Sequence, residues 1–138
     1  MFQQLDFIDL GQNDFTGVIP ASLFNIPTIR LVYLSNNRFD ETIPSTLGNA
    51  NSLRDLYLGG NQLEGQIPGI APGQLANLNE FLVHENNLTG EMPASICALV
   101  SPAGNLEDLW ADCAVVDGRV EVQCSCCTQC EDFPFHSR

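Results

Sequence analysis

The sequence is poor in positive charge: its 138 residues contain no lysine, and five arginines face 17 acidic residues, giving a formal net charge of −12. Binding to phosphate backbones needs a positive protein surface, so this balance excludes nucleic acid as a partner. Anionic membrane surfaces are disfavoured for the same reason. No apolar run approaches the roughly 18 residues that cross a bilayer, so we expect no membrane span in this chain.

Motifs for catalysis are also missing. The sequence has no Gly-x-Ser-x-Gly turn, no His-Glu-x-x-His helix and no phosphate loop. His84 lies near Glu80 and Glu85, which would suit a general base, but a histidine beside acids is more often a solvated surface residue. Glu107 and Asp108 are sequence neighbours and would point to opposite faces of a strand, so they form a poor acid–base pair. We therefore expect a protein that is not an enzyme and has no cofactor and no metal site.

What the sequence does contain is a repeat. Four blocks align on an asparagine followed by an apolar residue two positions later and an Ile-Pro or Met-Pro pair. We call these the ladder asparagines, and their spacing is 24, 24 and 25 residues: Asn13, Asn37, Asn61 and Asn86. A side-chain amide both donates and accepts, so each asparagine can satisfy backbone groups where the chain leaves a strand.

Apolar residues precede each ladder asparagine at positions −8, −5 and −3. They are Leu5/Ile8/Leu10, Ile29/Val32/Leu34, Leu53/Leu56/Leu58 and Leu78/Phe81/Val83. A repeat of this length has one short strand and a return segment, and it cannot bury its apolar face alone. Stacked copies of it predict a parallel sheet with the −5 and −3 side chains turned inward.

The pattern L-x-x-L-x-L-x-x-N-x-L-x-G-x-I-P resembles the plant-type extracellular leucine-rich repeat, over about residues 5–100. Polygalacturonase-inhibiting proteins and receptor-kinase ectodomains are its best-known members. The resemblance implies a right-handed solenoid of the α/β repeat class, with a parallel concave sheet, a 3-10 or irregular convex side and a recognition function. Glu41 replaces the usual glycine, and the Gly69–Gln74 stretch should form a convex-side loop because it holds two glycines and a proline.

Strand alternation places positions −6, −4 and −2 on the surface opposite the core. A degenerate fifth strand over residues 106–112 would extend these three lanes with Asp108, Trp110 and Asp112. Exposed Tyr and Trp on a rigid sheet are typical binding anchors, and the acids would make the surface negative toward its C-terminal end. The candidate ligand-binding residues are Phe7, Asp9, Leu31, Tyr33, Asp55, Tyr57, Glu80, Leu82, His84, Asp108 and Trp110.

We expect the partner to be another protein, with a peptide or a carbohydrate as alternatives. Binding through a different surface of the same fold is a competing interpretation. A structural or adhesive extracellular scaffold without a discrete ligand is the alternative function.

All six cysteines lie in one part of the chain: Cys97, Cys113, Cys124, Cys126, Cys127 and Cys130. They predict a cap of three disulfides with 15 possible pairings, closing the open end of the solenoid. The rival is a zinc site, but C-x-C-C-x-x-C is too crowded for the usual pair of knuckles. Asp117-Gly118 between β-branched runs predicts a hairpin. This segment also resembles the C-terminal cap of diatom and algal repeat proteins.

The division we expect is therefore 1–100 for the repeats and 101–138 for the cysteine-rich cap. Disulfides point to an extracellular or cell-surface location. Met1 runs directly into a repeat without a signal peptide or an N-terminal cap, so we expect the chain to be a fragment. Asn87-Leu88-Thr89 is the single N-glycosylation sequon, and we place it in a turn.

Overall fold

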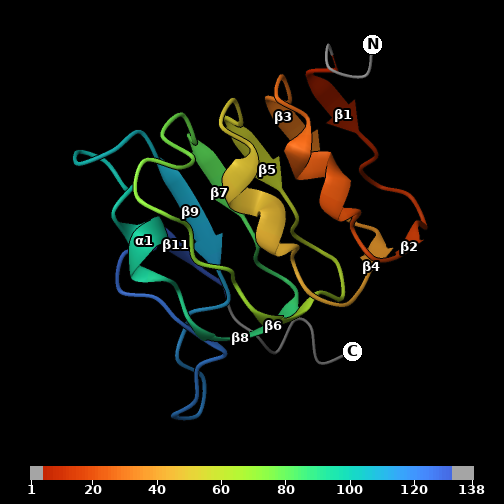
Figure 1. The fold of residues 1–138 in the computed structure, drawn as a ribbon. Helices are drawn as coiled ribbons and strands as arrows, with labels where there is room; N and C mark the ends of the chain where they lie inside the picture. The colour runs from red at the N-terminus through yellow and green to blue at the C-terminus, as the bar shows by residue number, and fades with distance from the viewer. Residues whose placement is uncertain (1–4, 132–138) are drawn as a thin grey trace.

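The computed structural model describes residues 5–131 and is organised around one parallel sheet of six strands. The order in the sheet follows the sequence, β1-β3-β5-β7-β9-β11. The strands are β1 (Phe7–Asp9), β3 (Leu31–Tyr33), β5 (Asp55–Tyr57), β7 (Glu80–Leu82), β9 (Asp108–Ala111) and β11 (Gln129–Cys130). Figure 1 shows these strands side by side, with the return segments crossing in front of them. The predicted leucine-rich-repeat solenoid is confirmed.

Short helices and irregular chain form the return side. They are the 3-10 helices η2 (Ala21–Asn25) and η3 (Ser45–Asn49) and the single α-helical turn α1 (Ala94–Cys97). Each begins directly after the proline of its block, whose fixed φ suits the first position before a helix. The third repeat has turns in place of a helix over residues 72–77, overlapping the glycine- and proline-containing stretch expected to loop there.

A second set of strands follows the ladder asparagines. β2 (Thr16–Gly17) pairs with β4 (Arg38–Phe39), and β6 (Glu64–Gln66), β8 (Asn87–Glu91) and β10 (Val122–Gln123) form a three-stranded parallel sheet. In Figure 1, β2 and β4 are labelled at the lower right and β6 and β8 near the bottom. The sequon residue Asn87 is therefore the exposed first residue of a strand, which corrects our placement of it in a turn.

The core lies between the large sheet and the return side. Every repeat contributes the same positions, and in the interior repeats these side chains are almost completely buried. The −8, −5 and −3 layers include Ile29, Val32, Leu34, Leu53, Leu56, Leu58, Leu78, Phe81 and Val83. Because each layer is completed by the next repeat, the core is continuous along the solenoid axis.

The ladder asparagines connect neighbouring repeats through buried hydrogen bonds. Asn61 Nδ2 donates to Leu58 O within its own repeat and to Leu34 O of the preceding repeat, both at 3.0 Å. Its Oδ1 accepts from Phe39 N at 3.1 Å. Asn37 and Asn86 make the equivalent set of bonds. One side chain thus satisfies the buried donor Phe39 N, and it shares the carbonyls of Leu34 and Leu58 with the neighbouring ladder asparagines.

Four residues after each ladder asparagine the backbone is left-handed. Glycine occupies this position in three repeats, as Gly17, Gly65 and Gly90, with φ between 79° and 88°. In the second repeat the residue is Glu41, at φ 63°. The departure from the repeat pattern at Glu41 therefore places a non-glycine residue where an L side chain is sterically disfavoured.

The first repeat has no neighbour on its outer side among the described residues. Its layer residues Leu5 and Leu10 are each 38% exposed, and Phe15 is 44% exposed. Within the described residues the Asn13 side chain donates to Leu10 O and Gly11 O of its own repeat, and only its backbone N–H reaches the second repeat, at Asn36 O. Ile19, on the opposite wall, is nevertheless buried because the second repeat covers it.

The C-terminal end is closed by three disulfides, Cys97–Cys126, Cys113–Cys130 and Cys124–Cys127. The predicted disulfide cap is confirmed. The first bond links α1 to the cysteine cluster, and the second links the end of β9 to β11. β11 itself was not expected, and it extends the large sheet by pairing in parallel with β9. The residues on either side of position 100 therefore share one sheet.

The expected hairpin in this segment is very short. Val116 and Arg119 exchange both backbone hydrogen bonds around Asp117-Gly118, and the pairing extends no further. Both central residues have positive φ, as the tightest hairpin turns require. The downstream strand instead leaves as β10 and pairs in parallel with β8. In the part of the chain that the structure describes, no helix is long and apolar enough to span a bilayer.

Candidate functional site

The large sheet aligns the candidate residues in three lanes across its outer surface. The −6 lane contains Phe7, Leu31, Asp55, Glu80 and Asp108, which face one another in register. The −4 lane contains Asp9, Tyr33, Tyr57, Leu82 and Trp110, and the structure adds Gln129 at its end. The −2 lane runs along Gly11, Ser35, Gly59 and His84. All eleven candidate residues are exposed or half-buried, so the sheet presents them together.

Aromatic rings form a continuous patch over the first three strands. Phe7 packs edge-on against Tyr33 with ring centroids 5.6 Å apart. Tyr33 and Tyr57 lie 4.6 Å apart and are tilted by 33°. Contacts of this kind fix the ring orientations, so the surface is rigid before any partner arrives. Asp9, Tyr33 and Tyr57 also line a hollow of about 380 Å³ that reaches the turn residues Gln12 and Asn36.

The carboxylates gather in the −6 lane beside this aromatic patch. Asp55, Glu80 and Asp108 lie on three consecutive strands, about 4.8 Å apart from strand to strand. The Tyr57 hydroxyl donates a hydrogen bond to Glu80 Oε1. In residues 5–131 none of the three carboxylates is paired with a cation. The lane is therefore a row of negative charge held against aromatic rings.

This crowding changes the ionisation of the row. The hydrogen bond from Tyr57 lowers the pKa of Glu80, but burial, a hydrogen bond with Asp108 and the charges of Asp55 and Asp108 outweigh it and raise that pKa above its ordinary value. Burial is the main cause of a raised pKa at Tyr57, and the bond to Glu80 adds to it. Burial and the nearby charge of Asp55 also raise the pKa of Tyr33. At neutral pH both tyrosines consequently remain hydroxyl donors.

His84 occupies a place that Gly59 leaves open. A Cβ at Gly59 would come within 2.9 Å of His84 Cε1, so the missing side chain makes room for the imidazole. The ring centroid lies 5.2 Å from that of Trp110. His84 Nδ1 is buried and has no hydrogen-bond partner within the described chain. The expectation of a solvated histidine is therefore only partly met, because its ring packs against an aromatic neighbour.

Asp112 does not belong to the exposed lanes, and this corrects our expectation. It is 1% exposed, and its carboxylate accepts from Glu85 N at 2.8 Å and Asn86 N at 3.1 Å. In earlier repeats backbone carbonyls receive the equivalent N–H groups, for example Glu85 O from Asn61 N. Asp112 replaces those carbonyls where the repeat pattern ends. The sequence gives one sign of this change: Ala114, two residues after Asp112, stands where the repeat pattern would place a ladder asparagine.

The described residues contain no group of three or more histidine, cysteine or acidic side chains arranged to hold a metal ion. The four clustered cysteines considered as zinc ligands are all in disulfides. The site therefore consists of aromatic faces, carboxylates and hydroxyl groups on a rigid sheet. Such groups suit non-covalent recognition of another molecule.

Comparison with known families agrees with this geometry. The Leucine Rich Repeat family model matches residues 4–26, 28–50 and 52–73. These matches begin just before the strands of the large sheet and extend through the return segments of the first three repeats. The chain is a leucine-rich-repeat protein, and its repeats are of the type found in plant receptor ectodomains. No curated protein matches the sequence.

Among solved structures, the chain is similar to the Arabidopsis receptor kinase HAESA in complex with the peptide hormone IDA and the co-receptor SERK1. The two share 34% identity at a TM-score of 0.63, over 67% of this chain and 15% of that one. The plant peptide hormone receptor RGFR1 in complex with RGF2 gives 33% identity and a TM-score of 0.70, over 79% and 16%. The Arabidopsis BIR2 ectodomain gives 32% identity and a TM-score of 0.63, over 74% and 53%. The chain thus spans about a sixth of the length of the first two receptors.

Proposed function

We propose that the chain is an extracellular, receptor-like recognition module whose concave sheet binds a protein or peptide carrying basic side chains. The observation that supports it most is the row of carboxylates Asp55, Glu80 and Asp108, which has no cationic partner in residues 5–131 and lies beside the Tyr33–Tyr57 pair. Opposite charges across an interface steer encounter and select partners, and tyrosines supply contact area at little entropic cost. The similarity to peptide-hormone receptor ectodomains agrees with this type of ligand.

The electrostatics of Glu80 also support a functional origin for the row. A carboxyl group with a raised pKa is less favourably ionised in the folded chain than in the unfolded chain. Its stabilising contribution is therefore lost as the pH rises through the raised pKa, and the charge opposes folding at neutral pH. A cationic partner would relieve that repulsion. We infer that the row serves binding rather than stability.

The test is capture of peptides by the immobilised domain from a library that varies in net charge. We expect saturable binding to be enriched in Lys- and Arg-containing peptides. The double variant Glu80→Gln/Asp108→Asn should reduce their affinity about tenfold or more, because each charge-assisted hydrogen bond contributes about 1.5–3 kcal/mol. Glu64→Gln, an exposed acid on β6, is the matched control and should leave binding unchanged.

Two further variants examine the aromatic part of the site. Tyr57→Ala and Trp110→Ala should weaken capture while leaving the thermal midpoint nearly unchanged, whereas Val115→Ala, at a position 71% exposed on the cap, should affect neither. Normal binding by both aromatic variants would show that this face is the wrong one. Absence of any saturable peptide or protein would instead favour the scaffold function.

The pH dependence of binding has a defined sign. Glu80 gains its proton at a higher pH than an ordinary glutamate because its pKa is raised. Affinity for a basic peptide should therefore decline on acidification earlier than the other acids alone would cause. In Glu80→Gln this early part of the decline should disappear. Isothermal titration between pH 7 and pH 5 measures both curves.

A further inference from the structure

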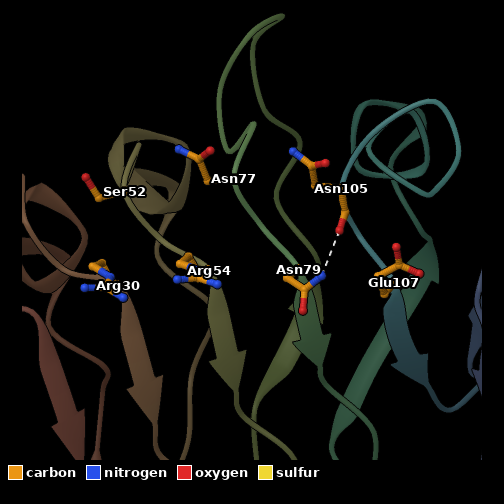
Figure 2. A pocket seen from close by; sticks show the side chains of 7 residues that line it. All are labelled: Arg30, Ser52, Arg54, Asn77, Asn79, Asn105 and Glu107. Atoms are coloured by element: carbon orange, nitrogen blue, oxygen red, sulfur yellow. Dashed lines mark hydrogen bonds between the residues drawn. The ribbon is translucent and has the colours of Figure 1, made fainter.

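A second polar site lies at the edge of the large sheet where the strands begin. It is a hollow of about 600 Å³ lined by Arg30, Ser52, Arg54, Asn77, Asn79, Asn105 and Glu107. Figure 2 shows the two arginine side chains next to each other at the starts of neighbouring strands, with Asn79 and Glu107 continuing the same row. We call this site the arginine shelf. None of its residues belongs to the outward-facing lanes described above.

The repeat backbone holds the two arginines side by side. Arg30 O accepts hydrogen bonds from Arg54 N at 2.8 Å and from Asp55 N at 3.1 Å. Arg54 O accepts in the same way from Asn79 N and Glu80 N. The two residues thus occupy the same position in consecutive repeats, one strand spacing of about 4.8 Å apart. Because the repeats stack in register, the two guanidinium groups lie in the same hollow.

This concentration of positive charge is unusual for the chain. The protein carries five arginines at a net charge of −12, and two of the five are here. Arg30 lies 3.9 Å from Asp6 in a loose pair whose two side chains are about half exposed. No carboxylate within the described residues pairs with Arg54. The guanidinium groups of Arg30 and Arg54 carry like charges on neighbouring strands and repel each other. No carboxylate lies between them in the row to offset this repulsion.

The serine and asparagine side chains of the hollow each already donate one hydrogen bond, and each amide keeps one further N–H. Ser52 Oγ donates to Pro27 O, and Asn77 Nδ2 donates to Asn51 O. Asn79 Nδ2 donates to Asn105 O, the bond drawn as a dashed line in Figure 2. The N–H groups that remain for a ligand are chiefly those of the guanidinium groups, which present five each in a planar fork. Such forks match the paired oxygens of carboxylate, sulfate and phosphate groups.

We propose that the arginine shelf binds an oxyanion: a carboxylate, or a sulfate or phosphate group, either free or carried by a larger ligand. The anion sits between Arg30 and Arg54. Glu107 lies two strand spacings beyond Arg54, roughly 10 Å away, and repels negative charge from that end of the hollow. Asp6 lies at the other end, 3.9 Å from Arg30, so the space between the two arginines is the part of the row farthest from both carboxylates. The proposal does not depend on the function of the concave lanes.

The test uses the whole disulfide-bonded chain and follows the Arg side-chain Nε–H signals by NMR. Sodium acetate, sulfate and phosphate are titrated against sodium chloride at constant ionic strength. We expect the Arg30 and Arg54 signals to shift saturably with a common midpoint for at least one oxyanion. The internal control is Arg38, an exposed arginine on β4 that lies near Asp14. Its signal should not shift with the same midpoint as those of Arg30 and Arg54.

Variants separate a built site from general charge screening. Arg54→Gln should weaken oxyanion binding about tenfold or more, whereas Arg38→Gln should leave it unchanged. Thermal melts check that both variants are folded. We expect them to be, because both arginine side chains are exposed. Unchanged affinity in Arg54→Gln, or a shared midpoint at Arg38, would overturn the proposal. So would the absence of a saturable response to all three anions and to the esters tested next.

A last comparison identifies the source of the anion. Tyrosine sulfate and tyrosine phosphate are compared with the free ions and with unmodified tyrosine. Tighter binding of an ester than of its free ion indicates a group carried by a larger molecule, and equal binding indicates the free ion. Both outcomes support an oxyanion site. Basic-peptide capture by Arg54→Gln should stay normal, so failure of the concave-face proposal would be recognised separately.

Discussion

The first repeat and the interior repeats have nearly the same sequence pattern but very different surroundings. The −3 layer shows this most clearly: Leu10 is 38% exposed, whereas Leu34 is 2% exposed and Leu58 is fully buried. The residue type is the same, and the difference is the presence of a neighbour on each side. A repeat of this fold therefore holds only half of its own core, and its stability depends on its position in the stack.

At the C-terminal end of the stack, the cysteine-rich cap takes the place of a neighbouring repeat. Leu109 and Ala111 of the last full strand are fully buried, although no further repeat follows them within the described residues. β11 and the cysteine cluster cover them, and three disulfides hold that short segment in place. Covalent cross-links here take over the role that apolar packing has between repeats. Four predictions examine this contrast between exposed, packed and cross-linked parts of the molecule.

The largest effect should come from the layer residues. Leu58→Ala removes a fully buried side chain and leaves a cavity, so we expect a loss of about 4 kcal/mol in the free energy of unfolding. Leu10→Ala should cost less than about 1 kcal/mol because water already reaches that position. Urea denaturation of both variants gives the comparison. Equal losses would mean that the first repeat is packed as tightly as the third.

The second-largest loss of stability should come from removing a disulfide of the cap. Replacing both Cys97 and Cys126 with alanine opens a loop of 29 residues. Loop-closure entropy for a loop of this length predicts a loss of about 3.6 kcal/mol. Hydrogen exchange of β9 and β11 should increase more than that of β3 if the bond acts on the cap. Uniform loss of protection along the sheet would argue that the cap and the repeats unfold as one unit.

The ladder asparagines should give a smaller difference of the same kind. Asn61→Ala leaves Phe39 N buried without a partner and removes one of the two amide donors to Leu34 O, which should cost about 2 kcal/mol. The Asn13 side chain donates to carbonyls of its own exposed turn, and Asn13→Ala should cost about 0.5 kcal/mol. Thermal unfolding followed by circular dichroism measures both. A similar cost at the two positions would show that the bonds between repeats add little.

The smallest expected effect is an increase in stability. Glu41 holds a left-handed conformation that its counterparts Gly17, Gly65 and Gly90 adopt without strain. Glu41→Gly should therefore stabilise the protein by about 1 kcal/mol, and Gly17→Ala should destabilise it by a similar amount because its φ is 88° even though the space around it is open. A chemical denaturation midpoint resolves both changes. A loss of stability in Glu41→Gly would mean that the carboxylate makes a compensating contact.

The sequence predicted most of the repeat region because each position recurs with the same role. The strands, the layers and the position of Glu41 all followed from the ladder register. The cap was harder, because β11 comprises only Gln129 and Cys130 and has no alternation of apolar and polar residues to reveal it. Asp112 was misplaced because a buried carboxylate replaced the expected pattern. The arginine shelf was missed although Arg30 and Arg54 both stand seven residues before a ladder asparagine.

The addition of β11 also sets a size for whatever binds the concave sheet. Six strands at about 4.8 Å give five steps, so the face measures roughly 24 Å from β1 to β11. An extended peptide rises about 3.3 Å per residue, and about seven residues running across the strands would cover the whole width. Beyond Gln129, at the last strand, the described sheet has no further row to offer. Under the proposed function, the cap therefore marks one end of the binding face, and a peptide running from β1 to β11 would contact it with about seven residues.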